Sequence, residues 1–177
     1  SEIIEATPAL LNDQRRRFTS SPDIVLQPNS VESVQKIMRF CFENRIRVTP
    51  QGGNTGLCGA TVTTEGVLLN ISKLNRIRDI NLADNSMTVE AGVILQNAQK
   101  AADKAGRLFP LSLASEGSCQ IGGNIACNAG GLNVLRYGSM RDLVLGLEVV
   151  LPNGELVSHL QPLHKNTTGY DLRHLFI

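Results

Sequence analysis

The stretch Gly117–Gly131 most constrains what this chain can fold into, because it holds five glycines, two asparagines and no charged side chain in fifteen residues. A loop of this composition has little to pack with, so its value lies in its exposed backbone. Glycine permits positive φ, so successive N–H groups can converge on one anion and the chain can lie flat against a ligand. Asn124 and Asn128 add amides that can complete hydrogen bonds. The alternative is a small-residue turn used for tight packing.

A second stretch, Pro50–Gly59, has the same character, since it is uncharged and rich in glycine and asparagine. We call Pro50–Gly59 the first loop and Gly117–Gly131 the second loop. Two such loops in one chain suggest the two sides of one long ligand, and they make tight packing a weaker explanation for either.

The composition is that of a globular protein without a nucleic-acid face. A chain of 177 residues fits one domain or two small subdomains that share a ligand. A net charge of +1 offers no basic surface for nucleic acid. The one basic run, Arg15–Arg17, is interpreted as solvated surface. Any anionic ligand must therefore be held locally, by loop amides.

The cysteines and the N-terminus indicate the compartment. The four cysteines form no C-x-x-C pair and lack the spacing of zinc ligands, which favours free thiols in a reducing environment. The first twelve residues hold no long apolar run, so we expect no signal peptide and no membrane span. We therefore expect a cytoplasmic protein, although a processed organellar protein would look the same. The three histidines form no pair four residues apart, and we expect no metal site.

The first third of the chain reads as a βαβ unit. Helix formers run to about Arg17, and Ile24–Leu26 is a short strand. Ser30 is placed to cap an amphipathic helix that reaches about Asn44. Ile46–Val48 forms the next strand and leads into the first loop. Ligands settle at the carboxyl ends of such strands.

The remainder reads as a mixed, largely antiparallel sheet with helices, so the fold class is α+β. An Asn-Gly turn at Asn153 joins two apolar segments and is a strong hairpin signal. Gly106 marks the end of a helix. Gly66–Ile71 is predicted as a buried strand of the βαβ unit, which ends near Ser72. From about Ile77 on, the predicted elements are strands at Ile77–Asn81 and Met87–Glu90, a helix at Val93–Lys104, a hairpin from the apolar run Leu143–Leu151 into Glu155–Ser158, and a helix from Asp171.

The familiar nucleotide and hydrolase signatures are absent. No G-x-G-x-x-G follows a strand, and Gly117–Gly123 lacks the Lys and Ser/Thr of a phosphate loop. No H-E-x-x-H or G-x-S-x-G occurs. A Rossmann site, an NTP–Mg²⁺ site and a serine hydrolase site are therefore not expected.

The two loops resemble those of a known family. Pro50–Leu57, Gly117–Asn124 and Asn128–Gly131 are similar to the FAD-binding domain of FAD-linked oxidases, the vanillyl-alcohol oxidase or PCMH type. Leu135–Gly138, Leu145–Leu151 and Thr168–Leu172 extend the resemblance. It covers roughly Asp23 to Ile177 and is closest to the branch of glycolate oxidase D subunits, D-lactate dehydrogenases and D-2-hydroxyglutarate dehydrogenases.

The resemblance implies FAD as cofactor and assigns each loop a part of it. The first loop would wrap the FAD pyrophosphate, through Gly52, Gly53, Asn54, Thr55 and Gly56, with Pro50 and Leu57 shaping the loop. The second would line the flavin side, through Pro110, Leu111, Gly117, Ser118, Gly122, Gly123, Asn124, Ala126 and Asn128, with Tyr137, Gly138 and Val150 nearby. Asn54 stands where some relatives carry a histidine bonded to FAD, so noncovalent binding is implied. Cys58 and Cys119 are expected to be buried small hydrophobes.

The resemblance also implies boundaries and an activity. Residues 1–22 would be an N-terminal segment, and 23–177 the FAD-binding domain, with subdomains 23–72 and 77–177 and FAD between them. Chains of the family continue into a cap domain that holds the substrate and the catalytic histidine, so no catalytic residue is expected here. We predict the FAD-binding fragment of an enzyme that oxidises a D-2-hydroxy acid by hydride transfer to flavin N5, inactive alone and possible as an oligomer.

Two alternatives stay open. The same loops could belong to a non-catalytic module that binds a nucleotide or a partner protein. A flavoprotein of another branch, such as a reductase of cell-wall precursors, would share the loops, although Thr168–Asp171 argues against it.

Overall fold

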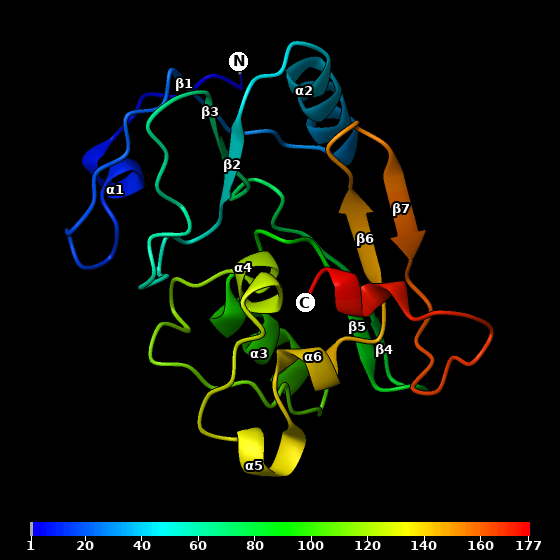
Figure 1. Ribbon diagram of the computed structural model, residues 1–177. Helices are drawn as coiled ribbons and strands as arrows, with labels where there is room; N and C mark the ends of the chain where they lie inside the picture. Colours follow the sequence, from blue (N-terminus) through cyan, green and yellow to red (C-terminus); the bar gives the residue numbers. More distant parts are fainter. Residues whose placement is uncertain (1) are drawn as a thin grey trace. The chain divides into compact units, whose positions relative to one another are not determined.

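The computed structural model describes residues 2–177, and the chain forms two compact units (Figure 1). The first comprises the chain up to Leu74 together with Val150–Leu156. The second comprises Asn75–Val149 and Val157–Ile177. The segment Val150–Leu156, which the sequence places in the second subdomain, thus belongs to the first unit.

The first unit is built on a parallel sheet of three strands. Its strands are β1 (Ile24–Leu26), β2 (Val48–Gln51) and β3 (Val67–Asn70), and the helix after β1 is α2 (Val31–Glu43). The predicted strand, helix and strand are present, but β2 begins at Val48 instead of Ile46 and continues to Gln51. The third strand, β3, lies between β1 and β2 and pairs with both. All four residues of β3 are buried, as expected of a central parallel strand.

The helix α2 is fixed at its start and packs on the sheet through one face. The Ser30 hydroxyl accepts from the Ser33 N–H at 3.1 Å, which confirms the predicted N-cap. Cys41 of α2 forms a buried cluster with Val67 and Leu69 of β3. This burial holds the crossover helix against the sheet.

The N-terminal helix is shorter than predicted. Helix α1 spans Pro8–Leu11 and does not reach Arg17. The reason is Asp13, whose carboxylate accepts from the N–H groups of Arg17 at 2.6 Å and Phe18 at 2.8 Å. These bonds turn the chain back on itself and offer the backbone an alternative to helix.

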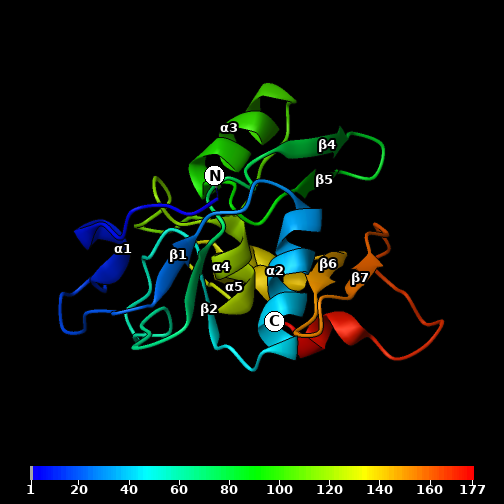
Figure 2. The same ribbon diagram turned by 90° about the horizontal axis from the view of Figure 1, so that it is seen from above.

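The second unit begins with a hairpin and a helix. Strands β4 (Ile77–Asn81) and β5 (Ser86–Val89) pair antiparallel as predicted, and α3 spans Leu95–Lys104. Leu95 and Ala98 of α3 belong to a buried cluster against which the hairpin packs, and Figure 2 shows α3 alongside β4 and β5. Gly106 follows the helix at φ +68°, in the left-handed position predicted for it.

The second loop is not a loop throughout, because its centre forms the helix α4 (Ile121–Ala126). The prediction of an open loop is wrong for these residues. The N–H of Ile121 donates to the carbonyl of Val93 at 2.9 Å, and that of Gly122 to Ala91 at 2.8 Å. These tertiary bonds, with Ile121 buried in the core, outweigh the poor helix propensity of a Gly-Gly pair.

Short elements complete the chain. Asp171 accepts from the Arg173 N–H and caps the final helical turn, so the helix predicted from Asp171 exists as one 3₁₀ turn. In the described residues, the antiparallel strands form two separate two-stranded sheets instead of one mixed sheet. The remaining elements are α5 (Val134–Tyr137), α6 (Met140–Leu143), β6 (Leu147–Val150), β7 (Leu156–His159) and η1 (Leu172–Leu175).

Candidate functional site

Most backbone N–H groups of the first loop, which follows β2, make no hydrogen bond within the described part of the protein. Pro50 and Gln51 are the last residues of β2, and the chain leaves the sheet after them. Within residues 2–177, no backbone N–H from Gly52 to Cys58 donates a hydrogen bond. Seven consecutive N–H groups are therefore available to an outside acceptor. A row of free N–H groups carries a local positive potential and suits an anion.

The middle of the first loop is held by the side chain of Asn54. Asn54 has a left-handed backbone at φ +52°, which asparagine tolerates better than most residues. Its amide donates to the carbonyls of Asn12 at 2.7 Å and Ala9 at 3.1 Å, and its carbonyl accepts from the Thr61 hydroxyl at 2.8 Å. The Asn54 side chain is thus used for bonds within the protein.

The tip of the loop is exposed. Leu57 and Cys58 are both exposed, so the expectation of a buried Cys58 is wrong. Cys58 lies in the part of the loop that leaves the sheet, where nothing covers it. Cys119 in the second loop is 2% exposed and confirms the same expectation there.

The second loop presents less free backbone than its composition suggests. Asn124 is buried, with its amide 3.6 Å from the Cys119 sulfur. Asn128 has a left-handed backbone, and its side chain accepts from the N–H of Arg141 at 2.9 Å. The predicted residues of this loop that reach the surface are Gly117, Ser118, Gly123 and Ala126, while Gly122 is partly buried.

The remaining predicted residues lie outside this loop. Leu111 lies in the core at 2% exposure, and its carbonyl accepts from the Gln99 amide at 2.8 Å. The Pro110 carbonyl accepts from the Asn133 amide at 2.9 Å. Tyr137 is exposed and Gly138 follows at φ +80°. Val150, half-buried, ends β6 and belongs to the first unit.

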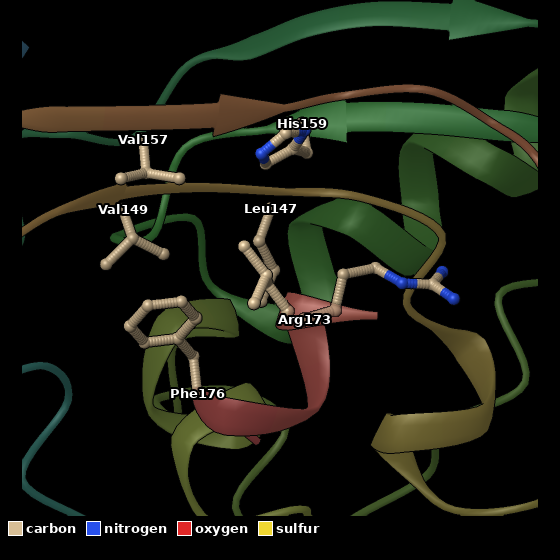
Figure 3. Close-up of a pocket in the computed structure, with 7 residues that line it drawn as sticks. Leu147, Val149, Val157, His159, Arg173 and Phe176 are labelled. Carbon is tan, nitrogen blue, oxygen red and sulfur yellow. The ribbon is translucent and has the colours of Figure 1, made fainter. Parts of the chain in front are cut away.

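The second unit also has a polar cavity of about 330 Å³ that sequence reasoning did not identify. Its lining includes His159, Tyr170 and Asp171. The adjoining hollow is apolar and small, at about 10 Å³, because Phe176 faces the valines of β6 and β7, as Figure 3 shows. The one available sequence clue to the polar cavity was the polar run from Asn166 to Asp171.

An ion pair fixes one wall of the polar cavity. Arg173 pairs with Asp171 and donates to the carbonyls of Val144 at 3.0 Å and Leu145 at 2.6 Å. The hydrogen bond from the Arg173 side chain lowers the pKa of Asp171 to about 2. The geometry is that of a structural brace for η1, since every polar atom of the pair is bound by protein.

Two further findings concern residues 2–177. They contain no group of three or more His, Cys, Asp or Glu side chains that could hold a metal ion. None of their helices has the length and apolar character needed to cross a membrane.

The sequence is similar to enzymes of 2-hydroxy acid metabolism. It is 42% identical over 178 residues to the D-2-hydroxyglutarate–pyruvate transhydrogenase of Saccharomyces cerevisiae, covering 100% of this chain and 36% of the relative. It is 45% identical over 166 residues to the D-2-hydroxyglutarate dehydrogenase of Xanthomonas citri pv. viticola, covering 93% and 35%. The chain thus spans about a third of the length of these curated relatives.

The fold and a family model agree with the resemblance described above. The structure matches 6-hydroxy-D-nicotine oxidase of Arthrobacter nicotinovorans with a TM-score of 0.77 at 23% identity, covering 88% of this chain and 35% of that one. This likeness confirms the predicted α+β fold of PCMH type. Residues 22–159 match the model of the FAD binding domain, which makes FAD the cofactor of the family. With this match over more than half of its length, the chain belongs to the FAD-binding domain family of FAD-linked oxidoreductases.

Proposed function

We propose that this chain is the FAD-binding part of an FAD-dependent oxidoreductase that oxidises a D-2-hydroxy acid. The observation that carries the proposal is the row of free N–H groups from Gly52 to Cys58. The substrate class rests on the names of the relatives, which act on D-2-hydroxyglutarate.

The first loop fits the FAD pyrophosphate. A pyrophosphate offers several oxygens along its length, and a row of N–H groups can donate to more than one of them. The loop itself has no charged side chain, so backbone donors would supply the stabilisation. The residues assigned to this contact are Gly52, Gly53, Asn54, Thr55 and Gly56, with Pro50 and Leu57 shaping the loop.

The second loop fits the flavin end of the cofactor. Gly117, Ser118 and Gly123 are exposed and small, so a planar group can approach their backbone. Leu111 and Asn124 are buried, and we assign them to support of this surface. The remaining residues assigned to it are Pro110, Gly122, Ala126 and Asn128, with Tyr137, Gly138 and Val150 nearby.

When bound, FAD would supply an acceptor for the hydride that leaves the substrate carbon bearing the hydroxyl group. The residues of this chain would bind and orient the cofactor. We assign none of them to proton transfer or to the substrate.

Noncovalent binding follows from Asn54. A carboxamide nitrogen is a poor nucleophile, and both ends of this amide are already hydrogen-bonded within the protein. Denaturation in acid should therefore release FAD into the supernatant, whereas a flavin that stays with the precipitate would contradict this assignment.

We also propose residues 23–177 as the FAD-binding domain and a reducing compartment, such as the cytoplasm, for the protein. The four cysteines are free, which suits such a compartment. A shortened protein that begins at Asp23 and still unfolds cooperatively in urea would support this boundary for folding, whatever its affinity for FAD. A shortened protein that does not fold would contradict it.

The test is a titration of FAD with the protein, in which binding is measured as quenching of flavin fluorescence. FAD is expected to bind more tightly than riboflavin, which shares the flavin but lacks the pyrophosphate. FAD at one hundred times its dissociation constant should stabilise the fold by about 2.7 kcal/mol. Equal affinity for riboflavin and FAD would remove the role of the first loop.

The second candidate is a non-catalytic nucleotide-binding module. The free N–H groups of the first loop also favour it, since they would donate to the diphosphate of ADP as well as to that of FAD. ADP that binds as tightly as FAD would favour this candidate, whereas much weaker ADP binding would favour the flavin enzyme.

A further inference from the structure

We propose that residues Ala9–Phe18, which we call the anchor segment, position the first loop and so form part of the FAD site. They precede the region that matches the family model, which begins at residue 22. The inference rests on the proposed function, because it assigns to this segment a role toward the FAD that the first loop would bind.

The anchor segment meets the first loop at the end of α1. The last carbonyls of a helix have no partner within it and need hydrogen-bond donors from elsewhere. Here the Asn54 amide donates to the carbonyls of Ala9 at 3.1 Å and Asn12 at 2.7 Å. The Asn54 side chain thus supplies hydrogen-bond donors to two carbonyl oxygens at the end of the helix.

The other two carbonyls at this end are also used. The Gln51 amide donates to Leu10 at 2.9 Å, and the backbone N–H of Ser20 donates to Leu11 at 2.7 Å. Gln51 is 1% exposed, so its bond is made away from water. If the buried Gln51 amide lost this acceptor, the loss of folding free energy would exceed the net contribution of the hydrogen bond.

The far end of the anchor segment touches the tip of the same loop. The Arg17 guanidinium donates to the Leu57 carbonyl at 3.1 Å, and the ring of Phe18 lies against Gly59. Asp13 holds this end in place by accepting from the N–H groups of Arg17 and Phe18. Arg17 therefore contacts the loop, where the sequence suggested only a solvated basic run.

These contacts explain how the loop can keep its N–H groups free. A glycine-rich segment without backbone bonds would sample many conformations and lose that freedom on binding. Contacts at Gln51, Asn54 and Leu57 hold the start, middle and tip of the loop. Much of the conformational entropy is therefore already lost when the protein folds, before the ligand binds. Preorganisation of this kind appears as affinity for the ligand.

The main test compares the FAD affinity of Asn54→Gly with that of the wild type. Glycine accepts φ +52° without strain, so this variant removes the three hydrogen bonds and leaves the backbone allowed. Its dissociation constant for FAD is expected to rise at least about tenfold. Lys36→Ala removes one exposed positive charge from the same unit and is expected to bind FAD as the wild type does.

A matched pair separates positioning from general destabilisation. Thr61→Val keeps the shape of the side chain but removes the donor to Asn54, whereas Thr61→Ser keeps the donor. FAD binding is expected to weaken in the valine variant and to be retained in the serine variant. Equal weakening in both would indicate packing at position 61 and overturn the role of the Asn54 bond.

Trypsin provides a readout that does not require FAD. Release of the anchor segment in Asn54→Gly should speed cleavage after Arg15, Arg16 and Arg17, with cleavage after the exposed Lys165 of the other unit unchanged. In the wild type, added FAD should slow cleavage at the three arginines, because coupling between two sites is reciprocal.

The outcomes separate the two proposals. A wild-type protein that binds no FAD would end the proposed function, and the anchor segment would then have no cofactor role. A wild type that binds FAD, together with an Asn54→Gly variant of equal affinity and equal trypsin sensitivity, would overturn the anchor segment alone.

Discussion

Glu90 shows how this protein keeps a charge inside the fold. It is 4% exposed and accepts from Arg76 through the backbone N–H at 2.8 Å and through the guanidinium at 2.7 and 3.0 Å. Burial raises the pKa of Glu90. The hydrogen bonds from Arg76 and the charge of Arg78 lower it by more, so the pKa lies below its ordinary value. The carboxylate therefore stays ionised.

The variant Glu90→Gln should lower the free energy of unfolding by about 1–3 kcal/mol, because charge-assisted bonds become neutral and one donor faces an amide nitrogen. Urea denaturation measures the change. The control is Glu148→Gln, because the Glu148 side chain is 21% exposed against 2% for Glu90, and its ion pair with Arg78 should contribute less than about 1 kcal/mol. A larger effect at Glu148 would contradict this ranking.

Three carboxyl groups predict the response of stability to acid. The pKa values are lowered at Asp13, chiefly by the Phe18 N–H, at Glu90, and at Asp171, to about 2. A lowered folded pKa means that the folded state favours the ionised form. Each group thus contributes stability above its unfolded pKa of about 4, and this is lost as pH falls through the folded value. Unfolding free energy should therefore decline between about pH 4 and 2, and Asp171→Asn should reduce the decline. Stability that increased in this range would refute the assignment.

The helix α4 depends on one close contact. A Cβ built on Gly122 would lie 2.7 Å from the Ala91 Cβ, whereas one built on Gly123 meets nothing within 4 Å. Gly122→Ala should therefore destabilise the protein by about 1–3 kcal/mol. Gly123→Ala should stabilise it by up to about 1 kcal/mol, since alanine is the better helix former. Thermal melting of the two variants provides the comparison, and equal shifts would contradict it.

The same pair bears on the cofactor. If Gly123 borders the flavin as proposed, Gly123→Ala should weaken FAD binding even though it stabilises the free protein. Unchanged FAD affinity would remove Gly123 from the proposed contacts.

The elements that could be predicted are those with a strong local signal. The cap at Ser30 and the apolar period of α2 lie within the helix itself, and the helix begins at Val31 as expected. The helix α4 has no such signal, because it is specified by Ala91 and Val93, about thirty residues earlier. Likewise, β3 reads as a strand, but nothing in its sequence says that it lies between β1 and β2.

The division of the chain into units depends on contacts that the sequence does not display. The turn between β6 and β7 belongs to the first unit, where the Gln35 amide donates to the Gly154 carbonyl at 3.0 Å across 119 positions. A local hairpin signal correctly identifies this turn, but it contains no information on which unit the turn joins. The free N–H groups of the first loop were foreseeable from its glycines, while the anchor segment was not.

This turn offers a test of the architecture. Gly154 and Gly106 both have positive φ, at +82° and +68°, so alanine is strained at either position by about 1–3 kcal/mol. A Cβ at Gly154 would also lie 2.7 Å from the Gln35 carbonyl oxygen and 2.9 Å from the Arg39 Cβ, whereas Gly106 has open space. Gly154→Ala should cost about 1–3 kcal/mol more than Gly106→Ala in urea denaturation. Equal costs would mean that the turn does not pack on α2.

The bonds between the anchor segment and the first loop have a consequence for how such proteins diverge. The acceptors at Ala9, Leu10 and Asn12 are backbone carbonyls, which are present whatever the side chain. Substitutions at these three positions would leave the acceptors in place, so the bonds constrain the donors Gln51 and Asn54 and not the side chains of the segment. The family match begins at residue 22, after this segment. If the anchor segment supports FAD binding as proposed, its contribution lies in backbone geometry and a motif of side chains would not reveal it.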